Sequence, residues 1–304
     1  MNSKMEIDMD NYKYENAIEI KEISKKYKDF SLNNTSFIVP KGSIVGFIGQ
    51  NGAGKTTTIK SVLNIIKTDS GRINIFGMDN VKDEKKIKED IAVVFDEMPF
   101  QEEFTPNNLN KIMKSIYDSW DEVVYKGYVE RFGIPYNKKI GELSKGMKMK
   151  LQIATALSHN ARLLIMDEAT GGLDPVVRSE ILDIFFDFIQ DESNSILMSS
   201  HITSDLEKIA DYIVFIDRGN ILLSGYKDDI LSEHAIIKCA KDEFVNIDKE
   251  YIVSSRQSEF GVEALTDDIS KFEDKYKGMV IDRATLEDIM VYYVKRNTDN
   301  IKKG

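Results

Sequence analysis

Residues 49–56 have the types and the spacing that wrap a polyphosphate. They read Gly-Gln-Asn-Gly-Ala-Gly-Lys-Thr and fit G-x-x-x-x-G-K-[ST], a loop whose backbone N–H groups surround phosphate oxygens. An apolar run, residues 44–48, precedes the loop, and a helix-like run, residues 57–63, follows it. A strand, a glycine-rich loop and a helix in this order direct a helix N-terminus at phosphate. The sequence therefore predicts a triphosphate site rather than a mere glycine-rich turn.

A second group of reactive residues ends another apolar run. Residues 163–166 (Leu-Leu-Ile-Met) lead directly into Asp167 and Glu168. If the run is a buried strand of the same sheet, Asp167 lies beside the phosphate loop and can hold Mg²⁺ through water, opposite the hydroxyl of Thr56. Glu168 is then placed to accept a proton from, or to orient, the water that attacks the γ-phosphate. Alone, an acidic pair at a strand end would be read as exposed surface.

A third motif, residues 143–147 (Leu-Ser-Lys-Gly-Met), precedes a predicted helix at residues 148–158. A serine and a glycine, Ser144 and Gly146, at a helix N-terminus predict another anion site. This site is too far along the chain to serve the same phosphate unless two chains pair.

The elements that must position these motifs alternate between strands and helices. The alternation predicts an α/β fold with a mostly parallel sheet and a ligand at the carboxyl ends of its strands. Residues 226–304 mix short strand patterns with a terminal helical pattern and predict a small α+β appendage. Strand patterns of the main fold lie at residues 17–23, 35–39, 71–77, 91–95, 161–166, 195–199 and 213–216, and a mainly helical insert spans about residues 100–160.

Composition excludes several classes of protein. The chain has 304 residues and a formal net charge of −10, which argues against a broad nucleic-acid surface, and we expect no nucleic-acid partner. A single cysteine, Cys239, rules out an intrachain disulfide. No apolar run reaches the roughly 18 residues that a membrane span needs, so we expect the chain not to cross a membrane. Residues 1–16 are acidic and polar, which is not typical of a secretory signal.

Over about residues 17–225, the chain resembles the nucleotide-binding subunit of an ABC transporter. The matching elements follow the family order. They are an A-loop aromatic (Tyr27), the phosphate loop or Walker A motif (49–56), the Q-loop region after the strand at 91–95, the signature (143–147), Walker B (163–168), the D-loop (172–174) and a switch histidine, His201. It implies a P-loop NTPase core of the RecA-like type, with an antiparallel β part and a helical insert that carries the signature. The domains are then a flexible leader (1–16), the ABC ATPase domain (17–225) and an accessory region (226–304).

The resemblance also implies a role for each matching residue. His201 senses the γ-phosphate and acts in catalysis with Glu168 and Asp96. Thr56, Asp96 and Asp167 are the predicted metal residues. Tyr27 either stacks on adenine or is an ordinary tyrosine. The predicted contacts to ATP, from both subunits of a dimer, are Tyr27, Gly49, Asn51, Gly52, Ala53, Gly54, Lys55, Thr56, Thr57, Ser144, Lys145, Gly146 and Asp174.

The chain departs from the family pattern at two places. Asp96 stands after the strand at 91–95, where most relatives have glutamine. Either Asp96 keeps the metal contact with an altered metal preference, or Glu97 takes its place. The signature has Lys145 and Met147 in place of the usual Gly and Gln. Lys145 either brings positive charge near the nucleotide of the facing subunit, partly offsetting Asp96, or points into solvent.

The function implied by the resemblance is that of an ATPase motor. Two subunits, identical or different, pair head to tail and bind ATP and Mg²⁺ between Walker A of one and the signature of the other. This dimer lies at the cytoplasmic face of the membrane and drives a separate transmembrane permease. The variant motifs and residues 282–289 are similar to those of bacterial exporters of peptides, antibiotics or lipid-like cargo. The alternatives are a soluble ABC-type ATPase that acts on a non-membrane macromolecule, and a non-catalytic regulatory subunit, which the presence of Glu168 argues against.

Overall fold

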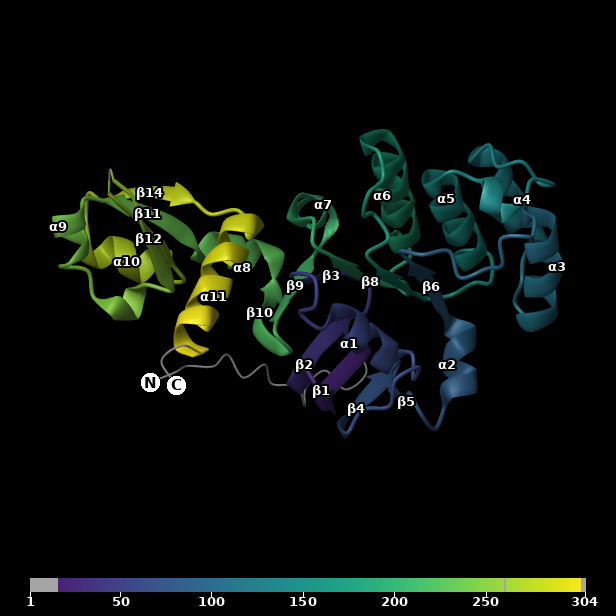
Figure 1. The fold of residues 1–304 in the computed structure, drawn as a ribbon, viewed down its shortest axis with the longest axis horizontal. Coiled ribbons are helices and arrows are strands. Elements are labelled where there is room, and N and C mark those ends of the chain that lie inside the picture. The colour runs from purple at the N-terminus through teal and green to yellow at the C-terminus, as the bar shows by residue number, and fades with distance from the viewer. Residues whose placement is uncertain (1–15, 260, 302–304) are drawn as a thin grey trace.

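The computed structural model describes residues 16–259 and 261–301, so the predicted leader lies outside the described residues except for Asn16. Within them the chain forms three sheets (Figure 1). The helical insert and the C-terminal sheet lie at opposite ends of the molecule, with the central sheet between them. The first sheet is antiparallel, in the order β2-β1-β4-β5. Its strands are β1 (Asn16–Lys26), β2 (Ser31–Pro40), β4 (Ser70–Ile75) and β5 (Met78–Asp79).

The central sheet has the order β10-β9-β3-β8-β7-β6 and is parallel except for β10, which pairs antiparallel with β9. Every residue of β3, β7, β8 and β9 is buried, which explains why these strands read as continuous apolar runs. The prediction of a mostly parallel α/β sheet is confirmed. The strands are β3 (Ile44–Ile48), β6 (Ile91–Phe95), β7 (Leu163–Asp167), β8 (Ser195–Ser200), β9 (Tyr212–Asp217) and β10 (Asn220–Tyr226).

Helices connect these strands and build the insert. The insert has its own apolar core, centred on Leu109, Tyr125, Val129 and Leu151. It is fastened to the central sheet by Gln152, whose amide accepts from Phe95 N–H and donates to the Phe95 carbonyl, both at 3.1 Å. The helices are α1 (Lys55–Val62), α2 (Glu84–Asp90), α3 (Pro106–Ile116), α4 (Glu122–Arg131), α5 (Lys145–Ala156), α6 (Pro175–Ile189) and α7 (Thr203–Ile209), with a short 3-10 turn at Ile140–Glu142.

Element boundaries differ from the predicted ones for local reasons. The strand predicted at residues 71–77 ends at Ile75, because Phe76 and Gly77 both have positive φ (48° and 74°) and form a turn. The signature helix begins at Lys145 rather than residue 148, because the Ser144 hydroxyl caps it.

The C-terminal part is an antiparallel sheet, β12-β13-β11-β14, flanked by helices. Its last helix packs on α7, and one apolar cluster runs from Ile196 and Leu206 of the central fold to Ile289 and Tyr292. The elements are α8 (Lys227–Glu233), β11 (Ala235–Cys239), α9 (Lys241–Phe244), a 3-10 turn (Lys249–Tyr251), β12 (Ser254–Gln257), β13 (Val262–Thr266), α10 (Ile269–Lys275), β14 (Val280–Arg283) and α11 (Leu286–Ile301). Across residues 16–259 and 261–301, no helix is long and apolar enough for a membrane span.

Candidate functional site

The phosphate loop connects β3 to α1 and ends at Gly54, which has a φ of 118° and precedes the first residue of the helix, Lys55. A Cβ atom at Gly54 would stand 2.8 Å from Leu32 Cδ2 and 2.9 Å from Phe30 Cζ. The backbone conformation and the packing therefore both require glycine here. Gly52 also has positive φ (80°), but its Cβ position is open. Asn51 and Gly52 are exposed, so the loop presents its backbone to a ligand.

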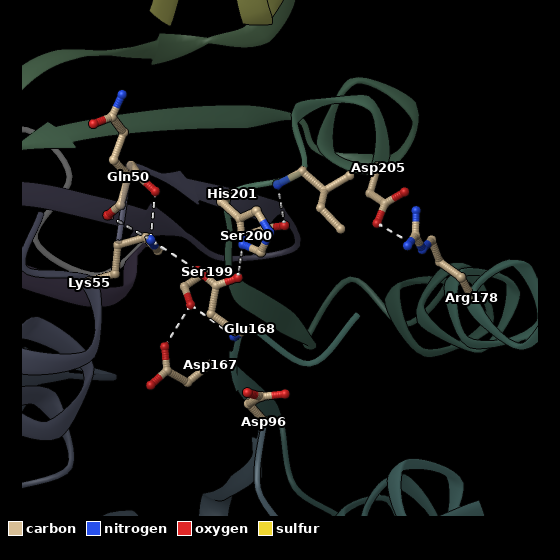
Figure 2. A network of polar contacts seen from close by, with 12 residues as sticks. Gln50, Lys55, Asp96, Asp167, Glu168, Arg178, Ser199, Ser200, His201 and Asp205 are labelled. Carbon is tan, nitrogen blue, oxygen red and sulfur yellow. Dashed lines mark hydrogen bonds and ion pairs between the residues drawn. The ribbon is translucent and has the colours of Figure 1, made fainter. Parts of the chain in front are cut away.

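The Lys55 ammonium is held inside this loop (Figure 2). Its side chain is 5% exposed, and Nζ donates to the carbonyls of Gly49 (2.6 Å) and Gln50 (3.2 Å). Nζ also lies 3.0 Å from Oε1 of Glu168, at the end of β7. The structure therefore brings the predicted phosphate lysine and the predicted catalytic carboxylate into one ion pair, although they stand at positions 55 and 168 of the sequence.

Glu168 is held in place from several sides. Its backbone is left-handed, with a φ of 56°, and its N–H donates to the carbonyl (3.2 Å) and hydroxyl (3.1 Å) of Ser199. His201 Nδ1 lies 2.6 Å from Oε2 of Glu168. Burial works to raise the pKa of the Glu168 carboxyl, but the hydrogen bonds and charges of Lys55 and His201 outweigh it and lower the net pKa. Glu168 is therefore an oriented, ionised base.

Asp167 lies beside Glu168 and is buried, with 7% of the residue exposed. Ser199 joins the two acids, because its hydroxyl donates to Asp167 Oδ1 at 2.7 Å while it accepts from Glu168 N–H (Figure 2). One carboxylate and the exposed Thr56 hydroxyl are oxygen ligands of the kind Mg²⁺ prefers when phosphate completes its shell. Within residues 16–259 and 261–301, no group of three or more acidic, cysteine or histidine side chains is placed to hold a metal ion.

The switch histidine is connected to the D-loop through α7. Asp205 on α7 is buried, and its Oδ2 lies 3.7 Å from Nε of Arg178 on α6. Arg178 also donates to the Leu173 carbonyl in the D-loop, at 3.3 Å. On the other side of α7, Glu207 Oε1 accepts from the backbone N–H of Leu286, the first residue of α11, at 2.6 Å. The segment after His201 is therefore fixed between the D-loop and the C-terminal helix.

The signature residues lie at the start of α5. Ser144 is the N-cap, with its hydroxyl accepting from Met147 N–H at 3.2 Å, and Gly146 faces Val177 of α6. Lys145 Nζ lies 3.1 Å from Oδ1 of Asp96 in the same chain. Lys145 is exposed and also contacts Asp96, and this contact tests neither of the two predicted roles of its charge.

The remaining predicted residues are spread around the loop. Tyr27 follows β1, is 40% exposed and has its ring 6.4 Å from that of Phe30. Asp174 caps α6 by accepting from the N–H groups of Val176 and Val177. Ala53 is buried, Thr57 is partly buried and Glu97 is exposed.

Sequence reasoning missed Ser199, Gln152, Phe30 and the Arg178–Asp205 pair. Ser199 directly precedes the Ser200-His201 pair, so its place at a strand end was a usable signal. Gln152 lies mid-helix, and Phe30 lies outside every motif. Their contacts come from the tertiary fold, so the local sequence gave no signal for them.

Comparison with known proteins identifies the class. A family model described as ABC transporter matches residues 32–171. The ABC transporter ATP-binding protein YtrB of Bacillus subtilis is 32% identical over 231 residues, which cover 76% of this chain and 79% of that protein. The bacitracin transport ATP-binding protein BcrA of Bacillus licheniformis is 35% identical, over 67% of this chain and 68% of that protein.

A solved structure, described as the ATP binding subunit of an ABC transporter, superposes with a TM-score of 0.64 at 27% identity and covers 71% of this chain and 92% of that one. This chain belongs to the ATP-binding proteins of ABC transporters. It binds and hydrolyses ATP and drives a transporter that has a transmembrane partner. The alternative, a soluble ABC-type ATPase that acts on a non-membrane macromolecule, is not favoured.

Proposed function

We propose that this chain drives an exporter of peptide-like or antibiotic cargo from the cytoplasmic face of the membrane, to which its transmembrane partner recruits it. Similarity to a bacitracin transport protein supports this type of cargo. The signature at 143–147 and the pattern at 282–289, both similar to exporter sequences, support the direction.

The working unit is a head-to-tail dimer of ATPase subunits with two composite ATP sites. The observation that carries this proposal is the separation of the two halves of the site within one chain. Lys55, Asp167, Glu168, Ser199 and His201 contact one another, whereas no hydrogen bond or ion pair among the described residues joins positions 144–147 to the phosphate loop. Ser144 and Lys145 are exposed, as a surface that a second subunit covers would be.

In the ATP cycle, the Lys55 ammonium leaves Glu168 and contacts the β- and γ-phosphates of ATP instead. This exchange leaves Glu168 paired with His201 Nδ1 and able to orient the attacking water. Thr56 and Asp167 would hold Mg²⁺, which would neutralise charge on the phosphates when bound. Ser199 ties the Asp167 carboxylate to the backbone N–H of Glu168. Because Lys55 acts on bound phosphate and Glu168 acts on water, their variants separate binding from hydrolysis.

Size-exclusion chromatography with light scattering on Glu168→Gln, with and without Mg-ATP, tests the proposal. We expect a monomer without nucleotide and a dimer with Mg-ATP but not with Mg-ADP. A protein that binds Mg-ATP and stays monomeric would contradict a self-sufficient dimer. Co-purification with a hydrophobic subunit encoded with the chain tests the partner.

A further inference from the structure

Lys145 and Asp96 form an ion pair at a junction of three segments. Asp96 directly follows β6, Lys145 is the first residue of α5, and the Lys145 Nζ atom approaches the D-loop so closely that a Cβ added to Gly172 would stand 3.1 Å from it. The Nζ–Oδ1 distance is 3.1 Å, and the two side chains are 51% and 50% exposed. An ion pair this exposed contributes little to stability and breaks easily.

The backbone under this pair is fixed, so an exchange of partners is a movement of the side chain alone. Gln152 of α5 is buried and makes two hydrogen bonds to the backbone of Phe95, the residue before Asp96. These bonds connect α5 to the last residue of β6. The four-carbon stem of Lys145 can still rotate its ammonium away from Asp96.

Dimer closure needs positive charge near the bound nucleotide. Each chain carries a net charge of −10, and each ATP adds further negative charge between the subunits. Lys145 lies directly next to Ser144, whose position in the signature faces the nucleotide of the second subunit in the proposed dimer. The start of α5 therefore presents the exposed Lys145 ammonium on the same surface as Ser144, which the second subunit would cover.

We propose that Lys145 exchanges its ion-pair partner during the ATP cycle, from Asp96 of its own chain to the γ-phosphate of ATP bound by the facing subunit. This inference rests on the head-to-tail dimer proposed above. Asp96 is then a resting partner that screens Lys145 and weakens closure until the γ-phosphate displaces it. The exchange favours ATP over ADP, because ADP offers no γ-phosphate.

Partner exchange has a distinctive consequence, since removing the two halves of the pair has opposite effects. In a Glu168→Gln background with saturating Mg-ATP, Lys145→Gln removes the phosphate contact and should raise the Kd of the dimer about fivefold or more. Asp96→Asn frees Lys145 while keeping an oxygen at that position, and should lower the Kd about two- to fivefold. Combining the two variants should give the Kd of Lys145→Gln alone.

The experiment is sedimentation velocity of these variants across a protein concentration series, with a fluorescent ATP analogue to check nucleotide binding by the monomer. Lys148→Gln is the matched control, because it removes a positive charge from the first turns of the same helix. It should leave the Kd nearly unchanged, and all variants should bind the analogue as the parent does.

Each other outcome has a distinct meaning. If Lys145→Gln and Asp96→Asn both weaken the dimer, the pair is a static brace or Asp96 is a metal residue, and the exchange is wrong. If Lys145→Gln behaves as Lys148→Gln does, Lys145 does not contact phosphate. If the Glu168→Gln parent itself binds Mg-ATP and never dimerises, the proposed dimer fails and the exchange fails with it.

Discussion

The two halves of the nucleotide site differ in how completely the single chain satisfies them. The Walker edge comprises Lys55, Asp167, Glu168, Ser199 and His201, and the signature edge comprises Asp96, Ser144, Lys145 and Gly146. On the Walker edge the Lys55 and Glu168 side chains are 5% and 18% exposed and are neutralised by each other. On the signature edge the Lys145 and Asp96 side chains are half exposed, and their ion pair lies at the surface. This contrast is expected if one edge is preorganised for chemistry and the other is completed by a second molecule.

We expect the largest changes in ATP binding and hydrolysis from variants of Lys55 and Glu168, which have different roles on the Walker edge. Lys55→Ala removes the charge that contacts ground-state phosphate and should abolish nucleotide binding. Glu168→Gln removes the base and should lower kcat about 10²- to 10⁴-fold while the protein still binds ATP. Equilibrium binding of a fluorescent ATP analogue and steady-state ATPase assays check the two variants. Normal turnover in Glu168→Gln would contradict the assignment of the base.

The next effect tests whether Ser199 organises the acids. Ser199→Ala leaves Asp167 and the Glu168 N–H without its hydroxyl and should cost about 1–3 kcal/mol in the free energy of unfolding. Ser195→Ala is the matched control, since Ser195 is buried at the opposite end of β8 and accepts from Gly42 N–H. Urea unfolding should report similar losses in the free energy of unfolding for both variants, but only Ser199→Ala should lower the ATPase rate. Equal loss of activity in the two variants would contradict the organising role.

The same comparison applies to caps in the helical insert. Ser144→Ala and Thr105→Ala each remove a side-chain cap, from α5 and α3, and should each cost about 1 kcal/mol of stability. Only Ser144→Ala should weaken the ATP-driven dimer, because Thr105 lies outside the signature edge. Thermal unfolding and light scattering measure the two properties. A dimer that responds equally to both variants would mean that the signature edge acts through folding alone.

The smallest effect is a difference in pH dependence between two buried histidines outside the site and Glu168 on the Walker edge. Burial lowers the pKa of His159, which follows the C-terminal end of α5 and has its Nε2 3.0 Å from the Ile91 carbonyl, and burial also lowers the pKa of His234. A histidine with a lowered pKa takes up a proton more readily when unfolded, so stability should fall as the pH drops below about 6.5. The pKa of Glu168 is also lowered, so the stability it contributes is lost only as the pH falls below the usual glutamate value of about 4.3.

Acid should therefore lower the stability of the protein through His159 and His234 before it removes the contribution of Glu168 on the Walker edge. Urea unfolding between pH 7.5 and 5 checks this order, and His159→Gln should flatten the curve. A slope that His159→Gln leaves unchanged would assign the acid sensitivity to His234 or to other groups.

The sequence predicted most of the central fold and many of the chemical groups of the Walker edge. The phosphate loop and the strand before Asp167 are local patterns with a strong physical meaning, so their elements could be read directly. Ser199 and the Gln152 bonds to Phe95 could not, because they depend on which strands become neighbours. The pairing of Lys145 with Asp96 within one chain could not be predicted either. The two residues lie far apart in the sequence, which offers other charged partners to each.

In the dimer that we propose, the Walker edge of one chain meets the signature edge of another. The most direct test is disulfide cross-linking in a Cys239→Ser, Glu168→Gln background, which removes the single native cysteine. One chain carries Asn51→Cys in the phosphate loop and the other carries Met147→Cys in the signature. We predict a cross-linked dimer only in the mixture and only with Mg-ATP. Cross-links between two Asn51→Cys chains, or a mixed cross-link that forms equally without nucleotide, would contradict the head-to-tail site.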